Sequence, residues 1–363
     1  MIPLTKVDLS GSEMDRISNV LKSGQLVQAN TVREFEQLLQ KRVDVDHAIA
    51  CSSGTLAIQL SLKALNIGPG DDVVMSDFCF PSVAAAILSV GANCVLCDVA
   101  PDCFNAGVEQ INAVLTPQTK AVIVVHQFGI PAGAKALVEQ LSVPVIEDAA
   151  CALGAVDDGR ACGTWGDFGC YSFHPRKIMT TAEGGLVVTA HEAFMERLRM
   201  LRNHGMVRLE HAVEFNDVGM SGRMTEIHAA IGLAQLERLD DQIEGRNRSA
   251  ALYRAALENV SGVFTNHETW HAGRVYQSMV VRIRPPWNRD VVINELRRRG
   301  IQSTLGTYAI HRQAPFVSRC QRPSNGLAES NRAQEESLTL PLWADMEEST
   351  VARVVDALCE VLC

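Results

Sequence analysis

The sequence predicts an α/β fold in which a mostly parallel sheet is covered by helices on both faces. Up to about residue 190, short runs rich in β-branched residues alternate with segments of helical spacing. The short runs lack polar alternation, so both faces of each strand are expected to be buried. Strands separated by helices in this order are typical of a doubly wound α/β domain.

Each element follows from its own segment of that pattern. The strands are predicted at 48–52, 72–76, 93–99, 120–126 and 143–148, and the helices between them at 54–65, 82–90, 108–115 and 134–141. Two further runs, 168–173 and 185–190, are joined by a short connection. We interpret this pair as a hairpin at the edge of the sheet.

The rest of the chain predicts a second, smaller α/β unit. A helix is expected near 191–203, still in the first unit, and a long helical pattern at 224–260 bridges the two units. The expected elements of the second unit are a strand at 276–283, a helix at 289–300, a Pro-containing loop region near 311–341 and a terminal helix at 349–362. A chain of 363 residues is too long for one compact core. We therefore divide it into a large domain, 1–240, and a small C-terminal domain, 241–363, with the ligand cleft expected between them.

Composition excludes several classes of protein. A hydrophobic fraction of 47% with 21% charged residues excludes disordered and fibrous chains. The net charge of −9 argues against general affinity for nucleic acid or for an anionic membrane. The first residues have no apolar signal core, and no run approaches the roughly 20 apolar residues of a membrane helix. We expect a cytoplasmic protein without nucleic-acid or membrane partners.

The eleven cysteines are expected to be reduced and buried, because they are scattered through apolar runs of a large chain. Cys94 and Cys97 form a CxxC pair, but they lie within a predicted buried strand. A single such pair is weak evidence for a zinc or redox site.

Unusual polar residues follow three of the predicted strands, at the edge where open α/β sheets bind ligands. The segment 51–55 (CSSGT) offers N–H groups and hydroxyls suited to a phosphate, although Ser and Thr are also ordinary helix caps. Asp148 ends a buried strand and needs a partner there: a helix cap, a salt bridge or a protonated cofactor nitrogen. Lys177 closes the segment 172–177 (SFHPRK). A lysine in a cleft can act as a Schiff-base nucleophile, whereas a lysine taken singly is usually solvated.

Together, a phosphate cup, a carboxylate and a lysine at strand ends of one sheet are the parts that a pyridoxal phosphate site requires. The cup would hold the phosphate, the carboxylate would keep the pyridine nitrogen protonated, and the lysine would hold the aldehyde. The sequence therefore predicts pyridoxal 5′-phosphate as the cofactor.

A specific set of motifs runs almost the whole length of the chain. The most specific is EDAA at 147–150, followed by S-F-H-P-x-K at 172–177 and EGG at 183–185. On these motifs the chain resembles the DegT/StrS-type sugar aminotransferases, a branch of the fold type I pyridoxal phosphate enzymes. Further matching segments are SGQLVQ (23–28), SSGTLAIQL (52–60), FCFPS (78–82), VVHQFGIPA (124–132), RNHGM (202–206), GMSGRMTEIHAAIGLAQLERLD (219–240) and LTLPLWADM (338–346).

The resemblance implies a role for individual residues. Lys177 would hold the cofactor and, once displaced from it, move the proton between Cα and C4′, while Asp148 would bind the pyridine nitrogen. Gly54, Thr55 and Ser172 would hold the phosphate. Phe80 stands at the position of an aromatic residue that stacks on the cofactor ring, with an ordinary core phenylalanine as the alternative.

The sequence departs from the family pattern at two positions. Cys151 stands where the family often has Gln or His near the ring oxygen of the cofactor, and we expect it only to neighbour the cofactor. Ser221 stands where the family has an asparagine that reaches the phosphate of the other subunit. Either Ser221 makes this contact through water, or Arg223 makes a larger part of the contact with the phosphate.

Histidines supply the remaining candidates for contact with substrate. His174 adjoins Lys177 and either touches substrate or supports the turn at Pro175. His204 lies in a loop that the resemblance places near the neighbouring subunit's active site. His126 ends a strand and is expected to satisfy backbone groups. No pair of these histidines has metal-ligand spacing, so no metal is predicted.

The resemblance implies a homodimer with shared active sites that transfers the amino group of L-glutamate to a keto sugar, with a nucleotide-linked sugar as the favoured acceptor. One alternative is an aminotransferase for a free keto sugar or a cyclitol. Sugar dehydration is a second, although members with that activity replace the lysine by histidine. A non-catalytic regulator or binding protein that keeps the fold is the alternative from a different class. The intact set of Asp148, Ser172 and Lys177 argues against it.

Overall fold

The computed structural model of the chain describes residues 1–265 and 270–363. Its helices are α1 (Ser12–Ser23), α2 (Asn30–Val43), α3 (Gly54–Ala64), α4 (Ser82–Ser89), α5 (Val108–Asn112), α6 (Ala134–Gln140), α7 (Glu192–Arg202), α8 (Glu226–Leu236), α9 (Leu239–Leu257), α10 (Arg289–Arg298), α11 (Ala328–Glu336) and α12 (Glu348–Leu362). Its longer strands are β1 (His47–Cys51), β2 (Asp72–Ser76), β4 (Asn93–Cys97), β5 (Thr119–Val125), β6 (Val145–Asp148), β9 (Phe168–Ser172), β10 (Gly185–Thr189), β14 (Met279–Ile283) and β18 (Ser337–Leu340). The shorter strands are β3 (Phe78–Cys79), β7 (Val156–Asp157), β8 (Arg160–Ala161), β11 (Met206–Arg208), β12 (Val213–Phe215), β13 (Val263–Phe264), β15 (Thr304–Leu305), β16 (Tyr308–Ala309) and β17 (Cys320–Gln321).

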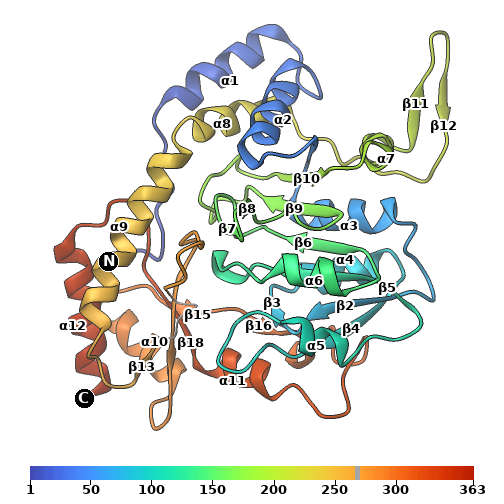
Figure 1. The fold of residues 1–363 in the computed structure, drawn as a ribbon. Coiled ribbons are helices and arrows are strands. Elements are labelled where there is room, and N and C mark those ends of the chain that lie inside the picture. Colours follow the sequence, from blue (N-terminus) through green and yellow to red (C-terminus); the bar gives the residue numbers. More distant parts are fainter. Residues whose placement is uncertain (266–269) are drawn as a thin grey trace.

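An eight-stranded sheet forms the centre of the molecule, in the order β1-β10-β9-β6-β5-β2-β4-β17 (Figure 1). Its pairs are parallel from β9 to β17, and β10 is antiparallel to both of its neighbours. The predicted mostly parallel α/β fold is confirmed. The 168–173 and 185–190 hairpin also forms, but its predicted place at the edge is wrong. Strand β1 pairs with the outer side of β10 over five residues and covers it.

Successive side chains of the central strands enter different cores, because side chains alternate across a strand. In β5, Ile123 packs in the core beneath α3 and α4, whereas Val122 and Val124 pack in the core beneath α5 and α6. In β2, Met75 likewise packs in the core beneath α3 and α4, and Val74 packs in the core beneath α5 and α6. Burial of both faces explains why these strands are apolar throughout, as the sequence indicated.

A second sheet, in the order β13-β14-β18-β15, is antiparallel and packs with α9, α10 and α12 around its own apolar core. The predicted long helix at 224–260 is two helices, α8 and α9. The helical run ends at Leu236, and a new helix begins at Leu239 after the non-helical cap Arg238.

The region near 311–341 is not a loop as predicted, because it contains β17, α11 and β18. Helix α11 has the sequence AESNRAQEE and buries Ser330, Ala333 and Glu336, so it shows no apolar periodicity that could predict it. Strand β17 extends the central sheet beside β4, and Ile2 pairs with Ile301 next to the second sheet. The division of the chain at residue 240 stays a prediction.

A two-stranded hairpin, β11–β12, extends away from the body of the molecule (Figure 1). Over the described residues, no helix combines the length and the apolar character needed to span a bilayer.

Candidate active site

A cavity of about 430 Å³ lies at the carboxyl ends of the central strands. It is lined by the ends of β5, β6 and β9, by the start of α3, and by residues 277–278, 304–308, 339–340 and 342 from around the second sheet. This position, outside the carboxyl ends of parallel strands, is where open α/β sheets bind ligands. The cavity is lined by eight of the predicted site residues: Gly54, Thr55, Phe80, Asp148, Cys151, Ser172, His174 and Lys177.

The first turn of α3 forms one wall of this cavity. The side chain of Ser53 caps the helix by accepting the Leu56 N–H at 3.1 Å. The first N–H groups of a helix have no partner within it, so those of Gly54 and Thr55 are available to an anion. Gly54 lies so close to β9 that an added Cβ would stand 2.8 Å from the Cβ of Ser172. The arrangement is a cradle of N–H groups and hydroxyls suited to a phosphate.

Asp148 ends β6 with its carboxylate at the cavity and is only 7% exposed. Its Oδ1 accepts the Ala150 N–H at 3.0 Å. Burial raises the pKa of Asp148, and the Ala150 N–H and the Lys177 ammonium only partly oppose this effect. Among the described residues Oδ2 has no hydrogen-bond partner, so it is available to a cationic N–H group in the cavity.

Lys177 reaches the cavity from the turn after β9, and its Nζ lies 3.1 Å from the Sγ of Cys151. The turn is closed by the Lys177 N–H, which donates to the carbonyl of His174 at 2.8 Å. His174 also lines the cavity, and its Nδ1 accepts the Arg176 N–H at 3.2 Å. Cys151 lies beside the amine because it is only three residues beyond Asp148, where strand β6 ends at the cavity.

Phe80 is not a core phenylalanine, since 62% of it is exposed. Its ring lies 6.4 Å from the ring of Tyr308, measured between centroids and tilted by 59°. Both rings line the cavity. They give it an aromatic wall suited to a flat ligand.

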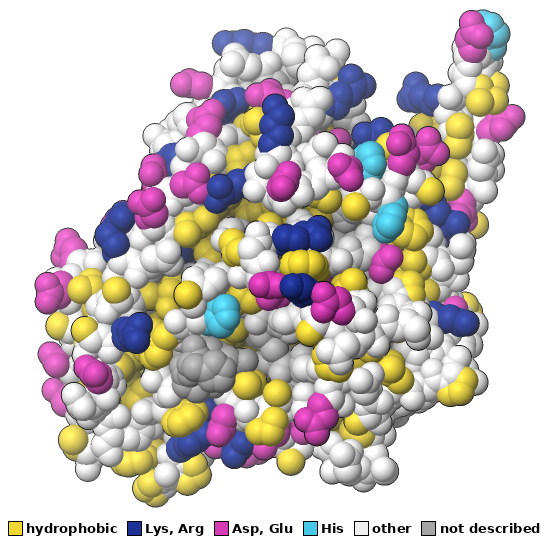
Figure 2. Space-filling view, in the orientation of Figure 1, with side chains coloured by type: hydrophobic (Ala, Val, Ile, Leu, Met, Phe, Trp, Pro, Cys, Tyr) yellow, Lys and Arg dark blue, Asp and Glu magenta, His cyan; other side chains and the backbone are white. Residues whose placement is uncertain are grey.

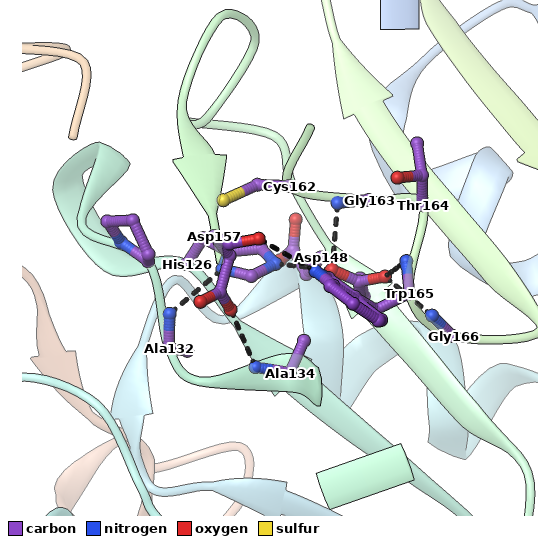
Figure 3. Close-up of polar contacts among 12 residues, drawn as sticks. His126, Ala132, Ala134, Asp148, Asp157, Cys162, Gly163, Thr164, Trp165 and Gly166 are labelled. Carbon is purple, nitrogen blue, oxygen red and sulfur yellow. Dashed lines mark hydrogen bonds and ion pairs between the residues drawn. The ribbon is translucent and has the colours of Figure 1, made fainter. Parts of the chain in front are cut away.

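Next to Asp148 in strand β6, the fully buried Glu147 accepts four hydrogen bonds, whose donor residues are labelled in Figure 3. One comes from the Nε2 of His126 at 2.8 Å, and three come from the backbone N–H groups of Gly163, Trp165 and Gly166 at 2.7–2.8 Å. Burial on its own would raise the pKa of Glu147, but these donors outweigh it and lower the pKa. The ionised carboxylate thus ties the 163–166 loop to the strand that carries Asp148.

Three predicted residues lie outside this cavity: His204, Ser221 and Arg223. Arg223 donates to the Oδ1 of Asn203 at 2.6 Å and to the Oγ of Ser221 at 2.8 Å. His204 is exposed and has a positive φ of 63°. Within one chain, these residues therefore form a separate cluster at the base of the β11–β12 hairpin.

Sequence reasoning missed Ser53, Tyr308 and the function of Glu147. Ser53 could have been found as the cap before Gly54, and Glu147 as the second carboxylate of the EDAA motif. Tyr308 had no usable signal, because β16 reaches the cavity by pairing with β3 across more than 200 residues of sequence. Among the described residues, no group of three or more His, Cys, Asp or Glu side chains is arranged to hold a metal ion.

The fold and the cavity define a class of protein, the fold type I aminotransferases. The model of the DegT/DnrJ/EryC1/StrS aminotransferase family matches residues 7–359. The chain belongs to this family. Its fold matches the crystal structure of the aminotransferase TlmJ from Streptoalloteichus hindustanus with a TM-score of 0.92 and 31% identity, over 100% of this chain and 99% of that one.

Two curated relatives resemble this chain over nearly its full length. The GDP-perosamine synthase of Caulobacter vibrioides is 34% identical over 98% of this chain and 96% of its own. The UDP-N-acetyl-3-dehydro-alpha-D-glucosamine 3-aminotransferase of Acidithiobacillus ferrooxidans is also 34% identical, over 95% of this chain and 92% of its own. Both names describe enzymes of nucleotide-linked amino sugars.

Proposed function

We propose that the protein is a pyridoxal 5′-phosphate-dependent aminotransferase that moves the amino group of L-glutamate to a nucleotide-linked keto sugar. The observation that carries the proposal is the meeting of Lys177, Asp148 and the start of α3 in one cavity. Family membership supports the reaction, and the names of the two curated relatives support the class of acceptor. Eleven free cysteines support a cytoplasmic location, because disulfides are rare in that compartment.

The described residues fit the cofactor. The N–H groups of Gly54 and Thr55 and the hydroxyl of Ser172 would hold its phosphate, and Phe80 would lie against its ring. The pyridine nitrogen would pair with Oδ2 of Asp148. When bound, the cofactor supplies an electron sink for the bonds at the amino carbon of the substrate.

The protein supplies the proton transfers. Burial of Asp148 strengthens its hold on a protonated nitrogen, because a carboxylate with a raised pKa is a better proton acceptor. The Nζ of Lys177 would take the proton from the amino carbon of the donor, Cα, and deliver it to C4′ of the cofactor. The thiol of Cys151 is close enough to hold this amine in place when it is not bonded to cofactor.

We further propose a homodimer in which His204, Ser221 and Arg223 complete the site of the other subunit. These residues lie together outside their own cavity, at the base of the β11–β12 hairpin. The hairpin and the loop after it expose large apolar side chains, including Phe215 at 69% and Val218 at 78%. Hydrophobic side chains are visible along the hairpin in Figure 2. Exposed apolar surface of this kind is typical of a protein interface.

The experiment uses L-glutamate labelled with ¹⁵N and a panel of nucleotide-linked 3-keto and 4-keto sugars. Mass spectrometry should show the label in one amino sugar, with 2-oxoglutarate as the co-product. Lys177→Ala should bind the cofactor without a covalent bond and transfer no nitrogen. Transfer by this variant, or borohydride fixation of the cofactor on a different lysine, would contradict the assignment.

A further inference from the structure

Arg176 and Lys177 are the arginine and the lysine that line the cavity, and of the two only the guanidinium of Arg176 is always charged. Lys177 is directed to Cys151. The Arg176 side chain is exposed, and within 1–265 and 270–363 its guanidinium has no hydrogen bond or ion pair. Other exposed arginines of the described chain also lack a partner, Arg353 among them, but Arg176 is the arginine that lines the cavity. The cavity therefore presents an unpaired guanidinium next to the amine of Lys177 in sequence.

The backbone of Arg176 is held on both sides. Its N–H donates to the Nδ1 of His174, and its carbonyl accepts the side-chain amide of Gln277. Gln277 is itself only 8% exposed and comes from the segment before β14, so the clamp joins this turn to the second sheet. Pro175 precedes Arg176 and restricts the turn further. Because the backbone of Arg176 is already held, the start of its side chain is directed to the cavity, and little backbone entropy is lost when a ligand binds.

The charges around the cavity favour an anionic ligand for this guanidinium. Asp148 and Glu183 are the carboxylate side chains that line the cavity, and neither forms an ion pair with Arg176 in the described part of the chain. A protein with a net charge of −9 repels anions at long range. On the face in Figure 2, Lys and Arg are interspersed with Asp and Glu and form no broad basic surface that could compensate. Recognition of an anion must then be local.

We propose that Arg176 is a specificity-determining residue that binds an oxyanion of the substrates at the mouth of the cavity. The planar guanidinium can donate two parallel hydrogen bonds to a carboxylate or a phosphate. Two sources of that chemistry exist, the second carboxylate of the amino donor and the diphosphate of the nucleotide-linked acceptor. The inference rests on the proposed function, because it takes its ligands from that reaction.

The test measures binding by calorimetry on the cofactor-loaded protein, with two ligands that do not react. Glutarate represents the dicarboxylate donor, and UDP or GDP represents the diphosphate. Arg176→Gln should weaken the binding of one or both by about 10- to 100-fold, because a hydrogen bond to a charged group is lost. Arg176→Lys keeps the charge and should lose less. The matched control is Arg353→Gln, an exposed arginine on α12 outside the cavity, which should bind both ligands as the wild type does.

The outcomes separate the two sources. Weaker binding of the nucleoside diphosphates alone assigns Arg176 to the acceptor, weaker binding of glutarate alone assigns it to the donor, and loss of both indicates shared use. Salt should weaken wild-type binding of the affected ligand more than that of Arg176→Gln, because the contact is exposed. If Arg176→Gln binds both ligands as tightly as Arg353→Gln, the inference is wrong. A wild type that binds them but transfers no nitrogen would instead contradict the proposed function.

Discussion

The Nε2 atom of His126 lies 2.8 Å from the Oε2 of Glu147, and neither side chain is exposed. The Nδ1 of the same imidazole accepts the Ala132 N–H at 3.1 Å. Because Nδ1 is an acceptor, the ring proton is on Nε2 and is donated to Glu147. The carboxylate therefore carries the charge of the pair. Its other three donors are backbone N–H groups, whose orientation is fixed by the fold of the chain.

Replacing this carboxylate should destabilise the fold. Each carboxylate oxygen accepts two hydrogen bonds, so in Glu147→Gln the NH₂ group of the new amide would face two buried donors. These would be either the N–H groups of Trp165 and Gly166 or those of Gly163 and the His126 ring, and both would lose their acceptor. Breaking such a buried network costs about 3–5 kcal/mol. Thermal unfolding at neutral pH should show a clearly lower Tm. The control is Glu244→Gln, whose carboxylate is 70% exposed and 3.7 Å from Arg248, and its effect should stay within about 0.5 kcal/mol.

The same carboxylate predicts a pH dependence. The pKa of Glu147 is below its ordinary value of 4.5 in the folded protein, so the unfolded chain takes up the proton first as the pH falls. The stability that Glu147 supplies is complete above about pH 4.5 and is lost as the pH falls through its folded pKa. The difference in Tm between wild type and Glu147→Gln should therefore be constant at higher pH and narrow below about pH 4.5. A difference that narrows toward alkaline pH would show instead that the His126 ring carries a second proton in the folded protein, because the pair would then weaken as the imidazole lost it.

Sequence reasoning reached the part of the site that lies at strand ends. Lys177 and Asp148 could be placed because apolar strands are easy to delimit and their carboxyl ends converge at one edge. The wall around Tyr308 could not be placed, since it depends on pairing between β16 and β3. Helix α11 was missed because its buried residues are mostly polar or small. Contacts between distant segments are fixed by packing of the whole chain, and local patterns do not encode them.

Gly54 should tolerate no side chain. A Cβ there would stand 2.8 Å from the Cβ of Ser172 and 3.3 Å from the carbonyl oxygen of Tyr171, and strand β9 cannot move away without disturbing the sheet. Gly54→Ala should weaken binding of pyridoxal phosphate by at least about tenfold, because the cradle must open. Absorbance after dialysis against a range of cofactor concentrations measures this. Gly68→Ala is the control, since its Cβ would meet nothing closer than the Val90 carbonyl at 3.8 Å. Equal affinity in the two variants would show that the phosphate is held elsewhere.

Cys151 should report on the occupancy of the cavity. Its thiol lines the cavity, whereas most other cysteines are buried. Iodoacetamide should modify Cys151 in the cofactor-free protein, and bound cofactor should slow this by about tenfold or more by closing access to the thiol. Cys363 is exposed and should react at the same rate in both states. Peptide mapping by mass spectrometry measures both sites at once. Unchanged labelling of Cys151 on cofactor binding would place the cofactor away from this wall.

Shared active sites should allow two inactive variants to complement each other. Lys177→Ala removes the amine of its own cavity, and Arg223→Ala removes a side chain that we propose acts in the partner's cavity. In a mixed dimer, the cavity of the Arg223→Ala subunit keeps its lysine and receives an intact Arg223 from the other chain. Random exchange at equal concentrations makes about half of the dimers mixed, each with one complete site, so about a quarter of wild-type activity should return.

Native mass spectrometry should confirm subunit exchange in the same samples, and each variant alone should be inactive. If exchange occurs and activity stays at zero, Arg223 acts within its own subunit, because no mixed dimer would then contain a complete site. If Arg223→Ala is active on its own, the cluster with Asn203 and Ser221 is only structural. A fully active monomer in sedimentation at assay concentration would contradict the dimer itself, and the exposed apolar residues of the β11–β12 hairpin would need a different partner.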